Sequence, residues 1–411
     1  MNRMYPKVTI SEEGEKWLNN GQMWMYRNNV VHLDESIENG ALVDIVTTDD
    51  RYLGTGFLSK NSHITVRILS KNKSDAIDRA FFKERIKFAY DFRKTLECRN
   101  ITNCRLIFGE ADQLPGLTVD RYNEILVAQI SSFGLDQRKD MLYEVLLEVL
   151  HEDGQDVKGI YERNDIKVRT KEGLPLEKGY WRHADLPTKT IINENGIKLH
   201  VDVENGQKTG YFLDQKANRV LLREMAQGKR VMDCFSHTGG FALNAAYGNA
   251  QQVVAVDVSQ TALDQAYENA KLNQLENRIS FVKADVFKYL DACEEGQFDI
   301  IILDPPAFTK SRRTIDHAYN GYKRINKKAM KLLGRGGYLI TCSCSRFMEI
   351  DNFEKMLREA AQETGVTLKQ VSVTQQNHDH PILWTMEETS YLKFYIFQIV
   401  KLPLYNLKDI K

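Results

Sequence analysis

The sequence predicts an α/β protein in which a doubly wound domain with a mixed sheet follows two smaller domains. Short apolar runs alternate with helical sequence from residue 191 onward, which is typical of parallel strands joined by right-handed crossovers. At 411 residues the chain is too long for a single hydrophobic core. Its 42% hydrophobic and 27% charged residues are typical of a globular protein. We expect domains at residues 1–75, 76–188 and 189–411.

Residues 1–75 predict a small β domain. Turn residues such as Asn39-Gly40 separate four short β-like runs, at 7–10, 41–46, 52–58 and 64–69. The stretch 12–17 after the first run and Trp24–Arg27 ahead of the second resemble the layout of a PUA domain, an RNA-binding barrel. A barrel used only for packing between domains is the alternative.

Residues 76–188 predict a mixed α/β domain. An amphipathic helix is expected over 80–96, with Phe82, Ile86, Ala89 and Leu96 on one face. Residues 105–108 and 124–130 predict strands, joined by a turn region over 109–123, and 142–150 predicts a second helix.

The last domain contains alternating strands and helices. Apolar runs are followed by helical sequence at 197–203, 231–234, 253–257, 279–285, 298–304 and 337–342. The final two runs, 367–374 and 391–401, have no helix between them that is long enough for a crossover. We therefore expect the last strand to run antiparallel.

Composition and the absence of targeting signals say little about the binding partners of the protein and predict its cellular location only broadly. Lysine plus arginine equals aspartate plus glutamate, so bulk charge does not favour nucleic acid. The first residues lack an apolar signal region, and no apolar run approaches the ~20 residues that span a bilayer, so we expect a cytoplasmic protein without a membrane partner. No C-x-x-C is present among the six cysteines. His378-Asp379-His380 resembles half of a metal site but lacks a second pair nearby, and we expect no metal.

Residues 231–241 predict a strand, a glycine-bearing turn and the start of a helix. The turn lacks the G-x-G-x-x-G fingerprint of dinucleotide-binding proteins. Its pattern of Asp233, Phe235 and Gly239 resembles the first motif of class I S-adenosylmethionine-dependent methyltransferases, which implies a Rossmann-like domain with a seven-stranded mixed sheet. Asp257 ends the next strand and is suited to two ribose hydroxyls. Asp285 ends the third, where such enzymes hold the adenine amino group, although it is also a plausible helix N-cap.

Asp304-Pro305-Pro306-Ala307-Phe308 ends the fourth strand. Two prolines hold the loop extended and fix the Asp304 side chain where a planar base could bind. Methyltransferases that act on exocyclic amines use a similar Pro-Pro element followed directly by an aromatic residue, and here Ala307 intervenes. We expect Pro305, Pro306 and Phe308 to contact substrate.

Two cysteines follow in Thr341-Cys-Ser-Cys-Ser345, at the end of the fifth strand. Methylation of carbon 5 of a pyrimidine needs a thiolate that attacks carbon 6, because carbon 5 is otherwise too poor a nucleophile. If the strand ends near Cys342, Cys344 lies just beyond it, over the crevice. We favour Cys344 as the nucleophile and keep Cys342 as the alternative.

A basic segment separates these two strands. The loop carries Lys310, Arg312 and Arg313, and the following helix carries Arg324, Lys327, Lys328 and Lys331 on one face. Only Asp316 offsets these cations between residues 309 and 331. We expect a local RNA-binding patch, with a solvated helix face as the alternative.

Taken together, these motifs resemble the bacterial 23S rRNA 5-methylcytosine methyltransferases that carry an N-terminal PUA domain. Further matches lie at 114–117, 207–215 and 379–381. The resemblance implies S-adenosylmethionine as methyl donor, 23S rRNA as substrate and a homodimer, and it adds Lys208, Phe212 and Arg219 to the cofactor site. Two alternatives stay open: an rRNA methyltransferase acting on guanine nitrogen 7 or an exocyclic amine, and an RNA-binding factor with a vestigial methyltransferase fold.

Overall fold

The computed structural model describes residues 5–97, 101–182, 185–309 and 314–401. The chain divides into two compact units. The first unit comprises residues 1–192, 201–213 and 378–389, and the second comprises 193–200, 214–377 and 390–411. The expected boundary near residue 75 therefore falls inside the first unit, and residues 378–389 belong to that unit although we expected them in the last domain. None of the helices in the described ranges is long and apolar enough to cross a membrane.

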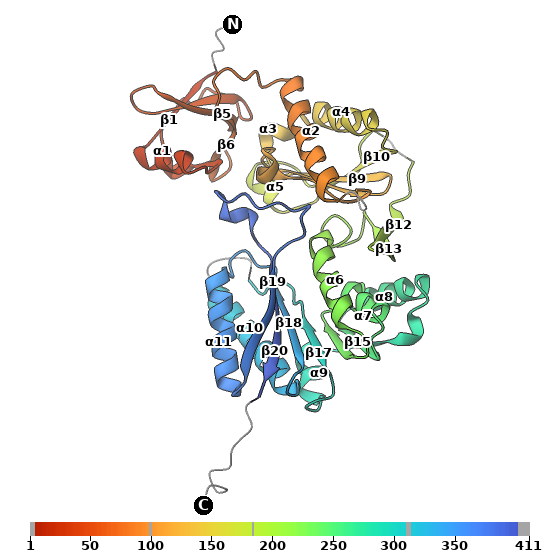
Figure 1. The fold of residues 1–411 in the computed structure, drawn as a ribbon. Helices are drawn as coiled ribbons and strands as arrows, with labels where there is room; N and C mark the ends of the chain where they lie inside the picture. The colour runs from red at the N-terminus through yellow and green to blue at the C-terminus, as the bar shows by residue number, and fades with distance from the viewer. Residues whose placement is uncertain (1–4, 98–100, 183–184, 310–313, 402–411) are drawn as a thin grey trace, which may run out of the picture. The chain divides into compact units, whose positions relative to one another are not determined.

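A six-stranded sheet forms the amino-terminal part of the first unit, in the order β2-β6-β5-β4-β1-β3 (Figure 1). Its strands are β1 (Lys7–Ile10), β2 (Trp24–Tyr26), β3 (Val30–Leu33), β4 (Leu42–Val46), β5 (Tyr52–Leu58) and β6 (Ile64–Ser70). Helix α1 (Glu12–Asn19) begins at Ser11, whose hydroxyl accepts the Gly14 amide. The four expected strands are present, while β2 and β3 are too short for a clear alternation in the sequence.

A five-stranded sheet, in the order β11-β10-β9-β8-β7, forms the rest of this unit. Its elements are α2 (Arg79–Leu96), β7 (Asn103–Phe108), β8 (Leu117–Tyr122), β9 (Ile125–Ile130), α3 (Phe133–Asp136), α4 (Lys139–Glu152), β10 (Gly159–Asn164), α5 (Val168–Lys171) and β11 (Glu177–Tyr180). The expected turn region over 109–123 was wrong in part, because it contains β8, which pairs with both β7 and β9.

The second unit contains a seven-stranded sheet in the order β16-β15-β14-β17-β18-β20-β19. Its strands are β14 (Arg230–Cys234), β15 (Gln252–Asp257), β16 (Ile279–Lys283), β17 (Ile300–Leu303), β18 (Tyr338–Ser343), β19 (Thr367–Thr374) and β20 (Lys393–Val400). Strand β20 runs antiparallel to both neighbours, as predicted. The fold is the expected Rossmann-like one. Strands β12 (Lys189–Glu194) and β13 (Ile197–Asp202) form a separate two-stranded sheet.

Helices cover both faces of the seven-stranded sheet (Figure 1). On one side lie α6 (Lys216–Met225), α7 (Gly240–Tyr247) and α8 (Gln260–Leu272). On the other, α9 (Val286–Ala292), α10 (Ile315–Leu332) and α11 (Ile350–Thr364) bury a core that includes Met232, Leu303 and Tyr322. Burial of this apolar surface is the main stabilising contribution to the unit.

The register of the parallel strands brings their carboxyl ends to one edge. Cys234 at the end of β14 pairs with Val256 of β15 and with Leu303 of β17, and Leu303 pairs with Thr341 of β18. Because the chain proceeds from β14 to β15 on one side and returns to β17 on the other, a topological switch point lies at β14. Open α/β sheets bind ligands in the crevice at such a point.

Candidate active site

Asp233 lies at the switch point and is almost completely buried, with 1% of its surface exposed. Its Oδ2 accepts hydrogen bonds from Ser236 Oγ at 2.8 Å and from the Ala242 amide at 3.0 Å. Its Oδ1 is buried without a hydrogen-bond partner among the residues that the structure describes. Burial, with smaller contributions from the carboxylates of Asp304 and Asp257, raises the pKa of Asp233 to about 7.

The turn after β14 has a left-handed backbone at three positions. Phe235, His237 and Gly239 have φ angles of 63°, 49° and 84°, a conformation that costs non-glycine residues energy and occurs at functional sites. A Cβ on Gly239 would lie 3.0 Å from Ala266 Cβ in α8. The left-handed φ and this close approach to α8 both favour glycine at position 239.

Asp257 closes this turn from the next strand. Its Oδ2 accepts the His237 amide and its Oδ1 accepts the Ser259 amide, both at 2.9 Å. The carboxylate is thus fixed at the end of β15, and each oxygen retains acceptor capacity for a ligand hydroxyl.

Asp285 has a different position from the one expected. Strand β16 ends at Lys283, so Asp285 lies beyond the strand end. Its carboxylate accepts the Lys288 amide at 3.0 Å and caps α9. The N-cap role weighed in the sequence analysis is therefore present, and a contact to adenine would be additional to it.

These residues fit S-adenosylmethionine. The sulfonium cation of this group matches the Asp233 carboxylate, which is buried and has no cationic partner among the described residues. Its ribose hydroxyls match the Asp257 carboxylate, which backbone amides hold in place. The unpartnered Asp233 Oδ1 is the observation that indicates a bound donor, because buried polar atoms are normally satisfied.

Asp304 immediately follows β17. Gln215 Nε2 donates to Asp304 Oδ2 at 3.2 Å, which orients the carboxylate. Pro305 is buried and Pro306 is exposed. The Phe308 ring is partly buried and packs against Tyr322 of α10, with the ring centroids 4.6 Å apart. Phe308 therefore anchors this loop to the helix.

The two cysteines of β18 differ in accessibility. The strand extends one residue beyond Cys342, which is fully buried. Burial raises the pKa of the Cys342 thiol well above its usual range, and the nearby Asp304 carboxylate raises it further. Cys344 is the first residue after the strand and is partly exposed.

The residues on either side of Cys344 are held in place. Ser343 Oγ donates to Tyr322 Oη at 3.1 Å, and Ser345 Oγ donates to the Thr309 carbonyl at 3.1 Å. The second bond joins the segment that carries Cys344 to the loop that begins at Asp304. The structure therefore brings the expected nucleophile and the expected base-binding loop together.

Two of the four cations expected on one face of α10, Lys327 and Lys328, form ion pairs, and Lys331 is exposed. Lys323 and Lys327 form ion pairs with Glu359 and Glu363 of α11, and Lys328 forms one with Asp291. The acids that offset these cations lie on other helices, so the count of acids within 309–331 was misleading. Arg324 is exposed and lies over the Phe287 ring at 4.3 Å. The loop residues Lys310, Arg312 and Arg313 lie outside the described residues.

Three residues taken from the resemblance lie in two places. Lys208 and Phe212 belong to the first unit, where the Lys208 Nζ lies 4.5 Å from the Phe212 ring centroid. Arg219 is buried in α6 of the second unit and donates to both carboxylate oxygens of Glu194, at 2.9 and 3.0 Å. Arg219 thus has a structural ion pair.

The His378-Asp379-His380 triplet contributes to packing within the first unit. Asp379 accepts the Arg105 amide at 2.9 Å and contacts His380 Nδ1 at 2.7 Å. Within the described ranges, no group of three histidine, cysteine or acidic side chains is arranged to hold a metal ion.

Sequence reasoning missed two residues, one beside Asp304 and one beside the segment that carries Cys344. Gln215 orients Asp304, and Lys393 is buried beside the segment that carries Cys344. Lys393 is the one charged residue in β20, and a charge within an apolar strand was the signal available.

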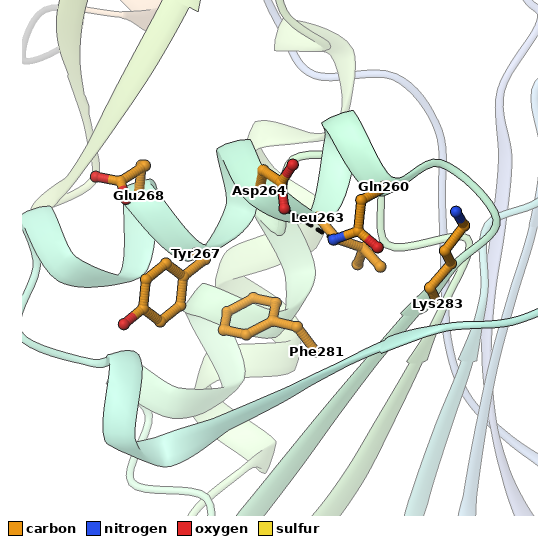
Figure 2. Close-up of a pocket in the computed structure, with 7 residues that line it drawn as sticks. All are labelled: Gln260, Leu263, Asp264, Tyr267, Glu268, Phe281 and Lys283. Atoms are coloured by element: carbon orange, nitrogen blue, oxygen red, sulfur yellow. Dashed lines mark hydrogen bonds between the residues drawn. The ribbon is translucent and has the colours of Figure 1, made fainter.

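A pocket of about 350 Å³ lies elsewhere, between α8 and β16 (Figure 2). It is lined by Gln260, Leu263, Asp264, Tyr267, Glu268, Phe281 and Lys283. Its residues include none of those predicted to bind the cofactor or the base.

Comparison with known proteins identifies the family to which the chain belongs. Residues 176–396 match the S-adenosylmethionine-dependent methyltransferase family, and residues 8–71 match the PUA-like domain family. The chain is 39% identical over 400 residues to the ribosomal RNA large subunit methyltransferase I of Salmonella typhi, covering 96% of this chain and 98% of that protein. The protein of the same name from Salmonella typhimurium shows the same identity and coverage.

Solved structures show the same fold. A Streptococcus mutans protein described as an S-adenosylmethionine-dependent methyltransferase has a TM-score of 0.80 at 24% identity, covering 96% of this chain and 100% of that one. A methyltransferase complexed with S-adenosylhomocysteine has a TM-score of 0.82 at 23% identity, with the same coverage. The chain therefore belongs to the family of S-adenosylmethionine-dependent methyltransferases, together with the ribosomal RNA large subunit methyltransferase I proteins.

Proposed function

We propose that this protein methylates carbon 5 of a cytosine in 23S rRNA through a covalent adduct with Cys344. The observation that carries the proposal is the partly exposed Cys344 on a segment joined to the Asp304 loop by the bond from Ser345 to Thr309. The matched relatives are named as large subunit rRNA methyltransferases, which supports ribosomal RNA as the substrate.

Cys344 supplies the nucleophile. Its thiolate attacks carbon 6 of the cytosine, and the electron pair of the carbon 5–carbon 6 double bond becomes available at carbon 5. S-adenosylmethionine would supply the methyl group, which would bond to carbon 5 as its bond to the sulfonium sulfur breaks, and S-adenosylhomocysteine would leave. Loss of the carbon 5 proton to a base then restores the double bond as the carbon 6–sulfur bond breaks, which returns the thiolate.

Asp304 recognises the base. A carboxyl group that shares a proton with cytosine nitrogen 3 stabilises the charge that develops on the ring and favours cytosine over uracil. The bond from Gln215 fixes the Asp304 carboxylate. Pro305 and Pro306 restrict the backbone of the same loop.

Asp233 and Asp257 are the residues we expect to contact the methyl donor most directly. Phe235 and Gly239 shape the turn between them, and Asp285 could contact the adenine beside its N-cap role. Lys208, Phe212 and Arg219 stay predictions from the resemblance, as does the homodimer.

RNA binding is assigned to two parts of the chain. The PUA-like domain at residues 8–71 belongs to a class that binds RNA. Arg324 offers an exposed guanidinium in α10 and follows Lys310, Arg312 and Arg313 in the sequence. Cations of this kind bind the phosphate backbone. A ribosomal substrate places the reaction in the cytoplasm.

Methyl transfer to 23S rRNA tests the proposal, with Cys344→Ala and Cys342→Ala compared against wild type. We expect Cys344→Ala to lose transfer and Cys342→Ala to retain it, with 5-methylcytidine as the modified nucleoside. Wild-type transfer by Cys344→Ala would overturn the covalent mechanism. Methylated guanosine or an exocyclic methylamine would support a nitrogen methyltransferase, and a lack of cofactor binding by calorimetry would support a vestigial fold.

A further inference from the structure

Lys393 is a buried lysine at the start of β20, with 5% of its surface exposed. Its Nζ donates to the Ser345 carbonyl at 2.7 Å. In the antiparallel pairing of β18 and β20, Lys393 lies opposite Ser343. Residues paired in this way point to the same face of a sheet, so the side chain projects beside the segment 343–345, whose middle residue is Cys344.

The Lys393 ammonium has no carboxylate in an ion pair with it among the residues of the described ranges. A buried charge without a counter-ion is costly, and natural proteins rarely keep one unless it is used. Burial lowers the pKa of Lys393 to about 8, while Cys344 and Glu349 act in the opposite direction. Glu349 is exposed at the start of α11, so water screens its charge.

Among the described residues, the other group whose negative charge acts on Lys393 is the ionised form of Cys344. The electrostatic effect of Cys344 on Lys393 is reciprocal, because two groups that interact shift each other's ionisation equally. A lysine cation beside a cysteine favours the thiolate, which is the form that attacks carbon. The hydrogen bond to the carbonyl of Ser345, the residue after Cys344, holds the ammonium in place.

We propose that Lys393 stabilises the thiolate of Cys344 and thereby prepares it for attack on the pyrimidine. Lys393 acts through Cys344 as a cation and gives up no proton in the reaction. The thiol proton leaves to solvent. The inference rests on the proposed function, since it assumes that Cys344 is the nucleophile.

Alkylation of the full-length protein by iodoacetamide, measured against pH, tests the proposal. Fragment-ion mass spectrometry separates modification of Cys344 from that of the buried Cys342 in the same peptide. Three substitutions separate charge from hydrogen bonding: Lys393→Arg keeps a cation, Lys393→Gln keeps only a donor, and Lys393→Met keeps neither. Lys369→Gln is the matched control, because Lys369 is an exposed lysine on the adjacent strand β19.

We expect the midpoint of the Cys344 alkylation profile to rise by about one pH unit or more in Lys393→Gln and Lys393→Met, and to stay near wild type in Lys393→Arg and Lys369→Gln. A wild-type midpoint in a folded Lys393→Gln protein would overturn the proposal. An equal rise in Lys393→Arg would assign the effect to loop geometry and would overturn it as well. Circular dichroism and cofactor affinity establish that each variant is folded.

This assay needs no RNA, so the two proposals fail separately. If Cys344→Ala transfers methyl groups at the wild-type rate, the covalent mechanism is wrong whatever the alkylation profile shows. If Cys344→Ala is inactive and the Lys393→Gln profile matches wild type, the nucleophile is correct and the role of Lys393 is wrong.

Discussion

Replacement of Asp233 by asparagine should change how the stability of this protein depends on pH. The folded state holds Asp233 with its pKa near 7, against an ordinary value of 3.8, because of burial and the neighbouring carboxylates. A group with a raised pKa contributes stability that is fully present below its unfolded pKa and is lost as the pH rises through its folded pKa. Ionisation of Asp233 therefore destabilises the cofactor-free protein between about pH 4 and pH 7.

The magnitude follows from the size of the shift. At about 1.4 kcal/mol for each pH unit, the roughly two units between pH 5 and the folded pKa near 7 should cost about 2 to 3 kcal/mol in the free energy of unfolding, with little further change up to pH 8. The asparagine side chain of the Asp233→Asn variant does not titrate, and its carbonyl oxygen can accept the Ser236 and Ala242 donors that Oδ2 accepts now. The variant should lack this loss and should be more stable than wild type near pH 8.

Denaturant unfolding at a series of pH values measures the effect, with S-adenosylmethionine affinity measured by calorimetry in parallel. A cationic donor stabilises the ionised carboxylate, so wild-type affinity should increase with pH up to about 7 while the affinity of Asp233→Asn stays low and flat. Unfolding profiles that run parallel in the two proteins would refute the reasoning, because Asp233 would then titrate at its ordinary pKa in the folded state.

Three further substitutions test other parts of the site. Ser345→Ala removes the hydrogen bond to the Thr309 carbonyl that joins the Cys344 segment to the Asp304 loop. It should lower the single-turnover methylation rate about tenfold and leave cofactor affinity unchanged, because the nucleophile is less well positioned. An unchanged rate would show that this hydrogen bond is not needed for catalysis. Phe308→Ala should lower the free energy of unfolding by about 2 kcal/mol, since the ring packs on α10, whereas a ring used only for base stacking would leave stability unchanged. Arg324→Gln should weaken RNA binding and lower by about one the number of ions released on binding, which is measured from the slope of affinity against salt concentration. The control Lys327→Gln should have a smaller effect because Lys327 is paired with Glu363. Equal effects of the two substitutions would contradict the assignment of RNA binding to Arg324.

Local patterns in the sequence predicted the catalytic fold well. The alternation of apolar runs and helices after residue 191 gave the sheet, and the absence of a crossover helix between β19 and β20 gave the antiparallel last strand. Such features depend on neighbouring residues, so the sequence carries them directly.

The elements that were missed depend on contacts or on turn chemistry. Strand β8 lies directly after the Pro115-Gly116 turn and ends at Tyr122, and the next residue, Asn123, has a left-handed φ of 55° in the hairpin turn into β9. Because this strand is short and lies between two turns, the sequence predicts it as part of the turn region over residues 109–123. Asp285 was placed at a strand end because the sequence does not show that β16 stops at Lys283.

Local sequence patterns also could not show which cations of α10 form ion pairs. The acids that pair with Lys323 and Lys327 are Glu359 and Glu363 of α11, which lie more than one secondary-structure element away along the chain. The packing of α10 against α11 decides which cations are free, and only the tertiary structure shows it. The same reason explains why Gln215 and Lys393 were not anticipated beside Asp304 and Cys344.

Trapping on RNA that contains 5-azacytidine tests the central claim most directly. Nitrogen in place of carbon 5 prevents release of the enzyme after methyl transfer, so the adduct persists and its peptide and nucleotide can be identified by mass spectrometry. We predict a covalent bond between Cys344 and carbon 6 of one cytosine-derived residue of 23S rRNA, formed by the wild type and by Cys342→Ala. A stable adduct through Cys342, or active enzyme that forms no adduct, would contradict the mechanism.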